Sequence, residues 1–110
     1  MTPASRDDER LAAIFKAMGH PLRLRLLQDV MRGELCVSEL GRQAESAQAT
    51  LSQHLGILRD RGLVIPERKG NTTCYRLSDQ RIADVIAHAR EVFELSDEPE
   101  AANAETATRE

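Results

Sequence analysis

The 110-residue chain has room for one domain, and its 41% apolar and 30% charged residues indicate a soluble globular protein. It has neither a stretch of about 18 apolar residues nor the apolar core of a signal peptide, so we expect no membrane span and a cytoplasmic protein with reduced cysteines. The net charge of −3 does not exclude nucleic acid as a partner, because residues 97–110 carry −4 whereas residues 52–76 carry +3.

Two helices are expected in the first third of the chain. Residues 5–8 resemble a capping box, and an apolar stripe at helical spacing follows until Gly19. His20 and Pro21 begin a second helix, because proline suits the first helical turn, and Gly33 ends it. With aromatic residues at 3%, the core must be aliphatic, which is typical of packed helices in small domains that dimerise.

The middle of the chain contains a second pair of expected helices. Residues 34–37 suit a short strand, and Ser38 can cap a short helix over 38–43. After a break at 44–46, an apolar face predicts a helix from about Gln48 to Arg61. Gly62 is its expected carboxyl-terminal stop.

A β-hairpin follows this helix. Residues 63–65 suit a strand, and Pro66 places that strand at the edge of a sheet. The sequence over 69–72 is typical of a turn, and the alternation over 73–77 predicts the returning strand.

A last helix and a tail complete the chain. Ser78 or Asp79 can cap the helix, whose apolar stripe ends near residue 93. We expect one domain over residues 1–95 and an acidic, disordered tail over 96–110 that is dispensable for folding.

Two helices joined by a turn and followed by a basic hairpin are typical of DNA binding, with the second helix in the major groove. The fold class is therefore mainly α with a small β-hairpin wing, a winged helix-turn-helix. Small polar side chains would contact bases, and basic ones would contact phosphates. The expected DNA-binding residues are Gln48, Thr50, Ser52, Gln53, His54, Arg59, Arg68 and Lys69. The same pattern also fits an ordinary polar helix face beside a polar hairpin.

Three segments carry a resemblance to one family. Residues 15–27 resemble the opening of ArsR-family winged-helix repressors, residues 52–64 resemble their recognition helix, and residues 70–77 resemble their wing strand. The resemblance implies a homodimer, built on the first and last helices, that represses transcription until an inducer binds. The family's capping serine precedes the recognition helix, whereas here Ser46 and Ala47 occupy that region, so we expect the cap at Ser46.

Apolar stripes on the first and last helices suit this dimer, although each stripe also has to contribute to its own domain's core. The expected interface consists of Leu11, Ile14, Phe15, Met18, Val85, Ile86, Ala89, Val92 and Phe93.

The resemblance implies two kinds of metal site, those of the arsenic-sensing and the zinc-sensing members of the family, and both are incomplete in this sequence. Of the three cysteines of arsenic-sensing members only Cys36 is present, because Ser38 and Gly41 occupy the other places. Of the ligands of zinc-sensing members on the last helix, only Asp79 matches. The remaining histidines suit other roles: His20 a helix start, and His88 a helix surface or interface.

The inducer site can involve the two cysteines. In this fold the short strand pairs with the second wing strand, so Cys36 and Cys74 become cross-strand neighbours that face outward, with Arg76 beside Cys74. A disulfide, sulfur chemistry or a soft metal or metalloid ion held by two thiolates could then shift the wing. The alternative is two unrelated strand cysteines.

We therefore expect a homodimeric repressor that binds double-stranded operator DNA and is released by a thiol-reactive signal at Cys36 and Cys74. A winged-helix protein-interaction module and a DNA-binding regulator without a sensing site are the alternatives. An enzyme is not expected, because the sequence contains no apparent nucleophile–base pair, phosphate-binding glycine loop or carboxylate pair.

Overall fold

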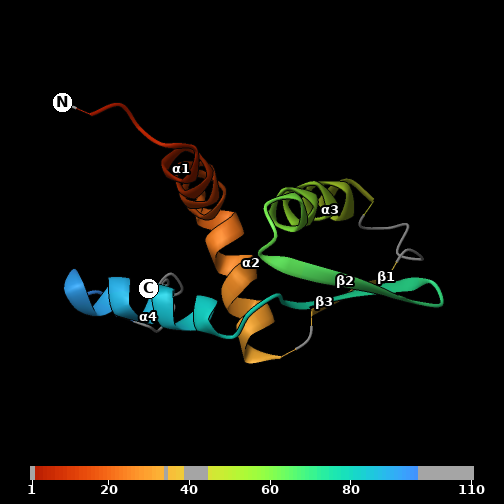
Figure 1. Ribbon diagram of the computed structural model, residues 1–110. Coiled ribbons are helices and arrows are strands. Elements are labelled where there is room, and N and C mark those ends of the chain that lie inside the picture. The colour runs from red at the N-terminus through yellow and green to blue at the C-terminus, as the bar shows by residue number, and fades with distance from the viewer. Residues whose placement is uncertain (1, 34, 39–44, 97–110) are drawn as a thin grey trace. The chain divides into compact units, whose positions relative to one another are not determined.

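The computed structural model describes residues 2–33, 35–38 and 45–96, and within these it contains four helices and a three-stranded antiparallel sheet (Figure 1). In chain order the elements are α1 (Arg6–Met18), α2 (Pro21–Arg32), β1 (Leu35–Ser38), α3 (Glu45–Asp60), β2 (Val64–Lys69), β3 (Thr72–Leu77) and α4 (Arg81–Val92). The predicted class, mainly α with a small β-hairpin wing, is confirmed. The predicted tail and most of the predicted helix over 38–43 lie outside the described residues, and Ser38 itself belongs to β1.

The first two helices begin where the sequence predicts. Asp8 donates its backbone N–H to Ser5 Oγ at 3.0 Å, and Ser5 donates its own N–H to Asp8 Oδ2 at 2.9 Å, which completes the capping box. At α2, Leu22 donates its N–H to Nδ1 of His20 at 3.1 Å, so His20 is the helix-start residue that was expected. The Ser5 cap stabilises α1 by about 1 kcal/mol.

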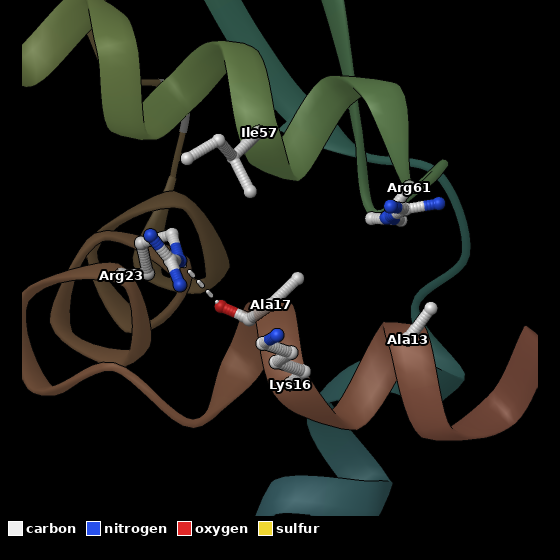
Figure 2. Close-up of a pocket in the computed structure, with 6 residues that line it drawn as sticks. All are labelled: Ala13, Lys16, Ala17, Arg23, Ile57 and Arg61. Carbon is white, nitrogen blue, oxygen red and sulfur yellow. Dashed lines mark hydrogen bonds between the residues drawn. The ribbon is translucent and has the colours of Figure 1, made fainter.

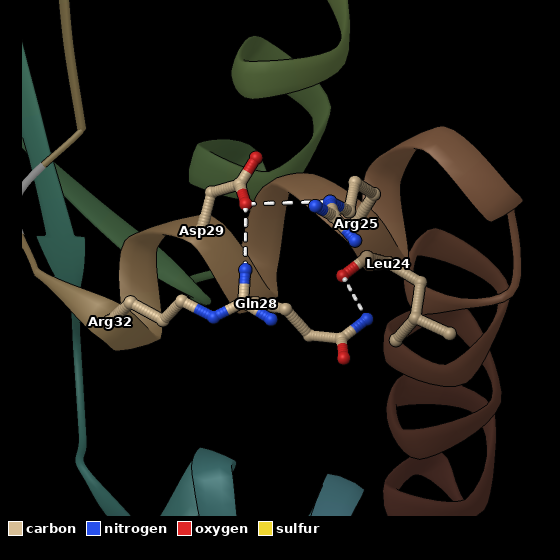
Figure 3. A network of polar contacts seen from close by, with 5 residues as sticks. All are labelled: Leu24, Arg25, Gln28, Asp29 and Arg32. Atoms are coloured by element: carbon tan, nitrogen blue, oxygen red, sulfur yellow. Dashed lines mark hydrogen bonds and ion pairs between the residues drawn. The ribbon is translucent and has the colours of Figure 1, made fainter. Parts of the chain in front are cut away.

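Helix α2 has a polar outer face and an apolar inner face. On the outer face, Asp29 Oδ1 lies 3.4 Å from Nε of Arg25 and 3.3 Å from Nη1 of Arg32 (Figure 3). These pairs are solvent-exposed and contribute only a few tenths of a kcal/mol each. On the inner face, Leu26 and Leu27 are buried, and they fix which side of α2 meets the rest of the fold.

The core lies where α2 and α3 meet the sheet. Helix α2 packs against α3 and β3, α3 packs against β2, and α1 contacts both α2 and α3. The most deeply buried side chains are Leu27, Leu55, Leu58 and Val64. Burying a leucine stabilises a fold by about 1.5–3 kcal/mol, so the two leucines of α3 hold that helix firmly in one rotation about its axis.

The sheet has the order β1-β3-β2, which makes β2 an edge strand as Pro66 predicted. Strands β2 and β3 form a hairpin with Lys69 opposite Thr72, so the loop has two residues. Gly70 has φ +65 at the first loop position, where glycine is favoured in tight hairpin turns. The tip of the hairpin extends away from α2 (Figure 1).

Helix α3 begins earlier than the sequence predicted. The expected break at 44–46 is wrong at Glu45 and Ser46, which belong to the helix, and Ser46 therefore cannot be its cap. The prediction relied on the apolar face that starts at Leu51. The first turn contains Glu45, Ala47 and Gln48, which have high helix propensity, so the helix extends beyond the segment that has an apolar face.

The chain divides into two compact units, Met1–Gln80 and Arg81–Glu110. Helix α4 lies in the second unit, where Ile86 is its buried residue. No helix among the described residues is both long enough and apolar enough to cross a membrane.

Candidate nucleic-acid interface

The exposed face of α3 carries the small polar side chains expected to contact bases. Thr50, Ser52 and Gln53 are solvent-exposed, whereas Leu55 and Leu58 on the opposite face are fully buried. The buried leucines thus determine which residues α3 presents to solvent. Gln48 belongs to α3, but its side chain lies outside the described part of the structure.

The wing residues are exposed, but two of the expected arginines already have partners. Arg68 donates from Nε to the carbonyl oxygen of Gly70 at 2.7 Å, so its side chain follows the turn of the hairpin. Arg59 donates to the Asp60 carboxylate, with Nη2 at 3.0 Å from Oδ1. Lys69 is exposed at the end of β2. The wing therefore presents positive charge at its tip, whereas the charge of Arg59 is partly neutralised.

His54 does not lie on the open face of α3 but in a cluster between three helices. Its ring centroid is 4.7 Å from that of His20, the residue that caps α2. Nη1 of Arg23 lies 3.3 Å from Nδ1 of His54, and Nε of the same arginine donates to the carbonyl oxygen of Ala17 at 2.7 Å. Arg23 therefore connects the end of α1 to α3 from its position on the first turn of α2.

The pKa of His54 is lowered from 6.5, first by desolvation of its half-buried ring and then by the positive charges of His20 and Arg23. A neutral imidazole can accept a hydrogen bond from Arg23 at Nδ1, whereas a protonated one cannot. The environment of His54 thus favours the state that bonds to Arg23.

Sequence reasoning did not identify Arg23. The one signal in the sequence is its position: Arg23 is a basic residue three positions after the His20 cap, on the side of α2 that faces α1.

Cys36 and Cys74 lie opposite each other in β1 and β3, and they are joined by a disulfide with Cα atoms 3.9 Å apart. The predicted cross-strand pairing is confirmed, and the expectation that the two cysteines are reduced is wrong for this structure. The prediction that the two side chains share the outward face agrees with the disulfide and with the exposure of Cys36, whereas Cys74 on that face is only 3% exposed. The physical reason is that β3 is the central strand and has a neighbour on each side.

Helices α1 and α4 each expose large apolar side chains. On α1, Leu11 and Phe15 are about half exposed, and Ile14 and Met18 are half-buried. In the second unit, Val85, Val92 and Phe93 are exposed, whereas Ile86 is buried. His88 is exposed and lies 3.6 Å from the Glu91 carboxylate through Nδ1.

Metal-ligating side chains do not gather in the described residues: no group of three or more histidine, cysteine, aspartate or glutamate side chains there could hold an ion. In this part of the chain the cysteine pair supplies two sulfur atoms, and no third ligand joins them.

Comparison with known proteins connects this geometry to a family. The family model for "Bacterial regulatory protein, arsR family" matches residues 20–65. The biofilm growth-associated repressor of Xylella fastidiosa is 36% identical over 83 residues, covering 76% of this chain and 73% of that protein.

Two solved structures share the fold. Rv0081 of Mycobacterium tuberculosis has a TM-score of 0.70 at 33% identity, with 83% of this chain and 92% of that chain covered. The homodimeric winged helix-turn-helix domain of Mb0332 from Mycobacterium bovis has a TM-score of 0.67 at 25% identity, with 89% and 94% covered. The chain belongs to the ArsR family of bacterial transcriptional regulators, a family of DNA-binding repressors and not of enzymes.

Proposed function

We propose that the protein is a homodimeric repressor that binds double-stranded operator DNA through α3 and the β2–β3 wing. The observation that carries the proposal is the orientation of α3. Two fully buried leucines hold one face of this helix, and Thr50, Ser52 and Gln53 are exposed on the rest. Such side chains suit the hydrogen-bonding edges of bases in the major groove, and Arg68 and Lys69 suit the phosphates beside it.

Dimerisation is part of this proposal, because a repressor that reads two half-sites needs two recognition helices about 34 Å apart. The exposed apolar residues of α1 and α4 offer surface for a second copy. The solved domain of Mb0332, a structural neighbour, is described as homodimeric.

The experiment is a fluorescence anisotropy titration of a duplex from upstream of the protein's own gene, with a shuffled duplex as the matched control. We expect tighter binding to the upstream duplex and a steep decrease of affinity with salt, because binding releases counterions from the DNA. Equal and weak binding to both duplexes at every salt concentration would instead favour the protein-interaction module.

We further propose that a thiol-reactive signal at Cys36 and Cys74 releases the DNA. A disulfide in a cytoplasmic protein is more often redox-sensing than structural, and this one connects the edge strand β1 to the wing strand β3. Its formation removes two protons and two electrons from two thiols, which reduce hydrogen peroxide to two water molecules or an alkyl hydroperoxide to one alcohol and one water. In the reduced state, the two thiolates could instead take up a sulfur species or a soft metal or metalloid ion.

The test compares operator affinity for reduced and for peroxide-treated protein, with the number of free thiols counted in each sample. We expect a clear loss of affinity on disulfide formation. Equal affinity of the two forms would favour a regulator in which the disulfide is structural and no sensing site lies at the wing.

A further inference from the structure

A cavity of about 250 Å³ lies between α1, α2 and α3 (Figure 2). All three helices supply side chains to its wall. The lining residues are Ala13, Lys16, Ala17, Arg23, Ile57 and Arg61.

Three of these six residues are cations, and no acidic side chain lines the cavity. Within the described residues, Lys16 and Arg61 have no carboxylate within ion-pair distance. Asp60 lines a smaller neighbouring cavity, but its carboxylate is already bonded to Arg59. The cavity therefore concentrates positive charge that no carboxylate among the described residues compensates at Lys16 and Arg61.

Arg23 is held in place at this cavity. Its Nε donates to the carbonyl oxygen of Ala17 at 2.7 Å, and its Nη1 lies 3.3 Å from His54 (Figure 2 shows the first contact). A guanidinium has five N–H donors, so these two contacts leave donors for a further acceptor. A pre-positioned arginine loses less entropy when it binds an anion than a mobile one does.

The rest of the wall is apolar. Ala13 and Ala17 supply methyl groups from α1, and Ile57 supplies its side chain from α3. At about 30 Å³ per liquid water molecule, the cavity has room for roughly eight waters. Its size and chemistry fit a molecule with a short apolar body and one anionic group.

From this geometry we propose that the cavity is a binding site for a small organic anion, such as a carboxylate with an apolar body. Lys16 binds the anionic group from α1, Arg61 binds it from the turn that follows α3, Arg23 donates to it from α2, and the alanines and Ile57 contact the apolar part. Such a ligand connects α1 to α3 and so favours one spacing between them. If α3 binds DNA as proposed above, the ligand also changes operator affinity.

On α1, the residues that line the cavity lie away from the exposed apolar stripe. At 100° per residue, Ala13, Lys16 and Ala17 lie on the side of α1 opposite the exposed pair Leu11 and Phe15. A second copy that packs on the apolar stripe of α1 therefore contacts the side of that helix away from the cavity.

The test is calorimetric titration of the full chain, without DNA, with benzoate and with neutral benzamide at constant ionic strength. We expect saturable binding of benzoate with one site per chain and no saturable binding of benzamide. In the double variant Lys16→Gln/Arg61→Gln the affinity for benzoate should fall about tenfold or more, because two charge-assisted hydrogen bonds are lost. Arg6→Gln, an exposed site at the other end of α1, is the matched control and should bind benzoate like the parent.

Thermal unfolding of each variant verifies that it is folded, and a titration with inorganic phosphate distinguishes an apolar requirement from a site for any anion. Equal behaviour of benzoate and benzamide, or unchanged affinity in the double variant, would overturn the proposal. A third result would also overturn the proposal: the parent binds no benzoate, and the double variant has a lower affinity for all duplexes. Lys16 and Arg61 would then be assigned to contacts with DNA phosphates. Since benzoate binding is measured without DNA, a failure of the cavity proposal is distinguishable from a failure of the proposed operator binding.

Discussion

Reduction of the Cys36–Cys74 disulfide should lower the stability of the fold by about 4 kcal/mol. The two cysteines are 38 positions apart in the sequence, and the bond closes a loop of that length in the unfolded chain. In the loop-entropy account, a closure of this size removes about 13 cal/mol/K of entropy from the unfolded state, which is about 4 kcal/mol at 25 °C. For a folded part of this size, such a change lowers Tm by roughly 15–30 °C.

The assay is thermal unfolding followed by circular dichroism, with and without a phosphine reductant, and with thiols counted in both samples. Cys36→Ser is the second perturbation, because Cys36 is exposed and a serine hydroxyl there stays hydrated. Cys74→Ser is less informative, since Cys74 is 3% exposed and a buried hydroxyl adds its own cost of about 1–3 kcal/mol.

A reduced protein with two titratable thiols and an unchanged Tm would refute the loop-entropy reasoning. A protein in which both Tm and operator affinity change would show that the wing depends on the bond. If Tm falls but operator affinity stays the same, the disulfide is structural.

Three further predictions concern the DNA, the dimer and pH. Gln53→Ala should lower the free energy of operator binding by about 1–3 kcal/mol in anisotropy titrations, whereas Lys69→Gln should weaken binding to all duplexes alike. If Gln53→Ala kept the parent's preference for the operator, Gln53 would not contact bases. Phe15→Asp places a charge on the exposed stripe of α1 and should give a monomer in sedimentation at micromolar concentration, where a persisting dimer would exclude that stripe from the interface. Because the pKa of folded His54 lies below 6.5, its contribution to the free energy of unfolding is complete above pH 6.5 and is lost as the pH falls towards the folded pKa. The variant His54→Gln should therefore show a weaker dependence of the unfolding free energy on pH in that range. A pH profile equal to that of the parent would refute this prediction.

Much of the fold could be predicted because its signals are local. The capping box at Ser5, the proline after His20 and the positive-φ glycine in the hairpin each act over a few residues, and each determines an element's end in the structure. The edge position of β2 follows from one proline that lacks an N–H donor. The start of α3 was missed because an amphipathic pattern only shows where a helix packs, and the first turn of α3 has no apolar anchor.

The candidate site was predictable only where it depends on one element. The exposure of Thr50 and Gln53 follows from the leucines on the other face of the same helix. The role of Arg23 depends on a carbonyl oxygen of α1 and a histidine ring of α3, and the sequence around Arg23 does not show that these groups lie beside it. Likewise, strand alternation predicted the face of the sheet on which Cys74 lies, but its low exposure depends on the strands that flank β3.

The unequal exposure of the two cysteines predicts which sulfur reacts. An external thiolate such as glutathione reaches the exposed Cys36 side chain and not Cys74 at 3% exposure. Its sulfur forms a bond to Sγ of Cys36, the Cys36–Cys74 bond breaks, and Cys74 leaves as a thiolate that takes up a proton.

Mass spectrometry of peptides from glutathione-treated, acid-quenched protein should therefore find the mixed disulfide on Cys36 and the free thiol on Cys74. The denatured protein is the matched control, because both sulfurs are then equally accessible and both mixed disulfides should form. A mixed disulfide found mainly on Cys74 of the folded protein would mean that the wing opens before it reacts, and that the exposure in the folded state does not direct the chemistry.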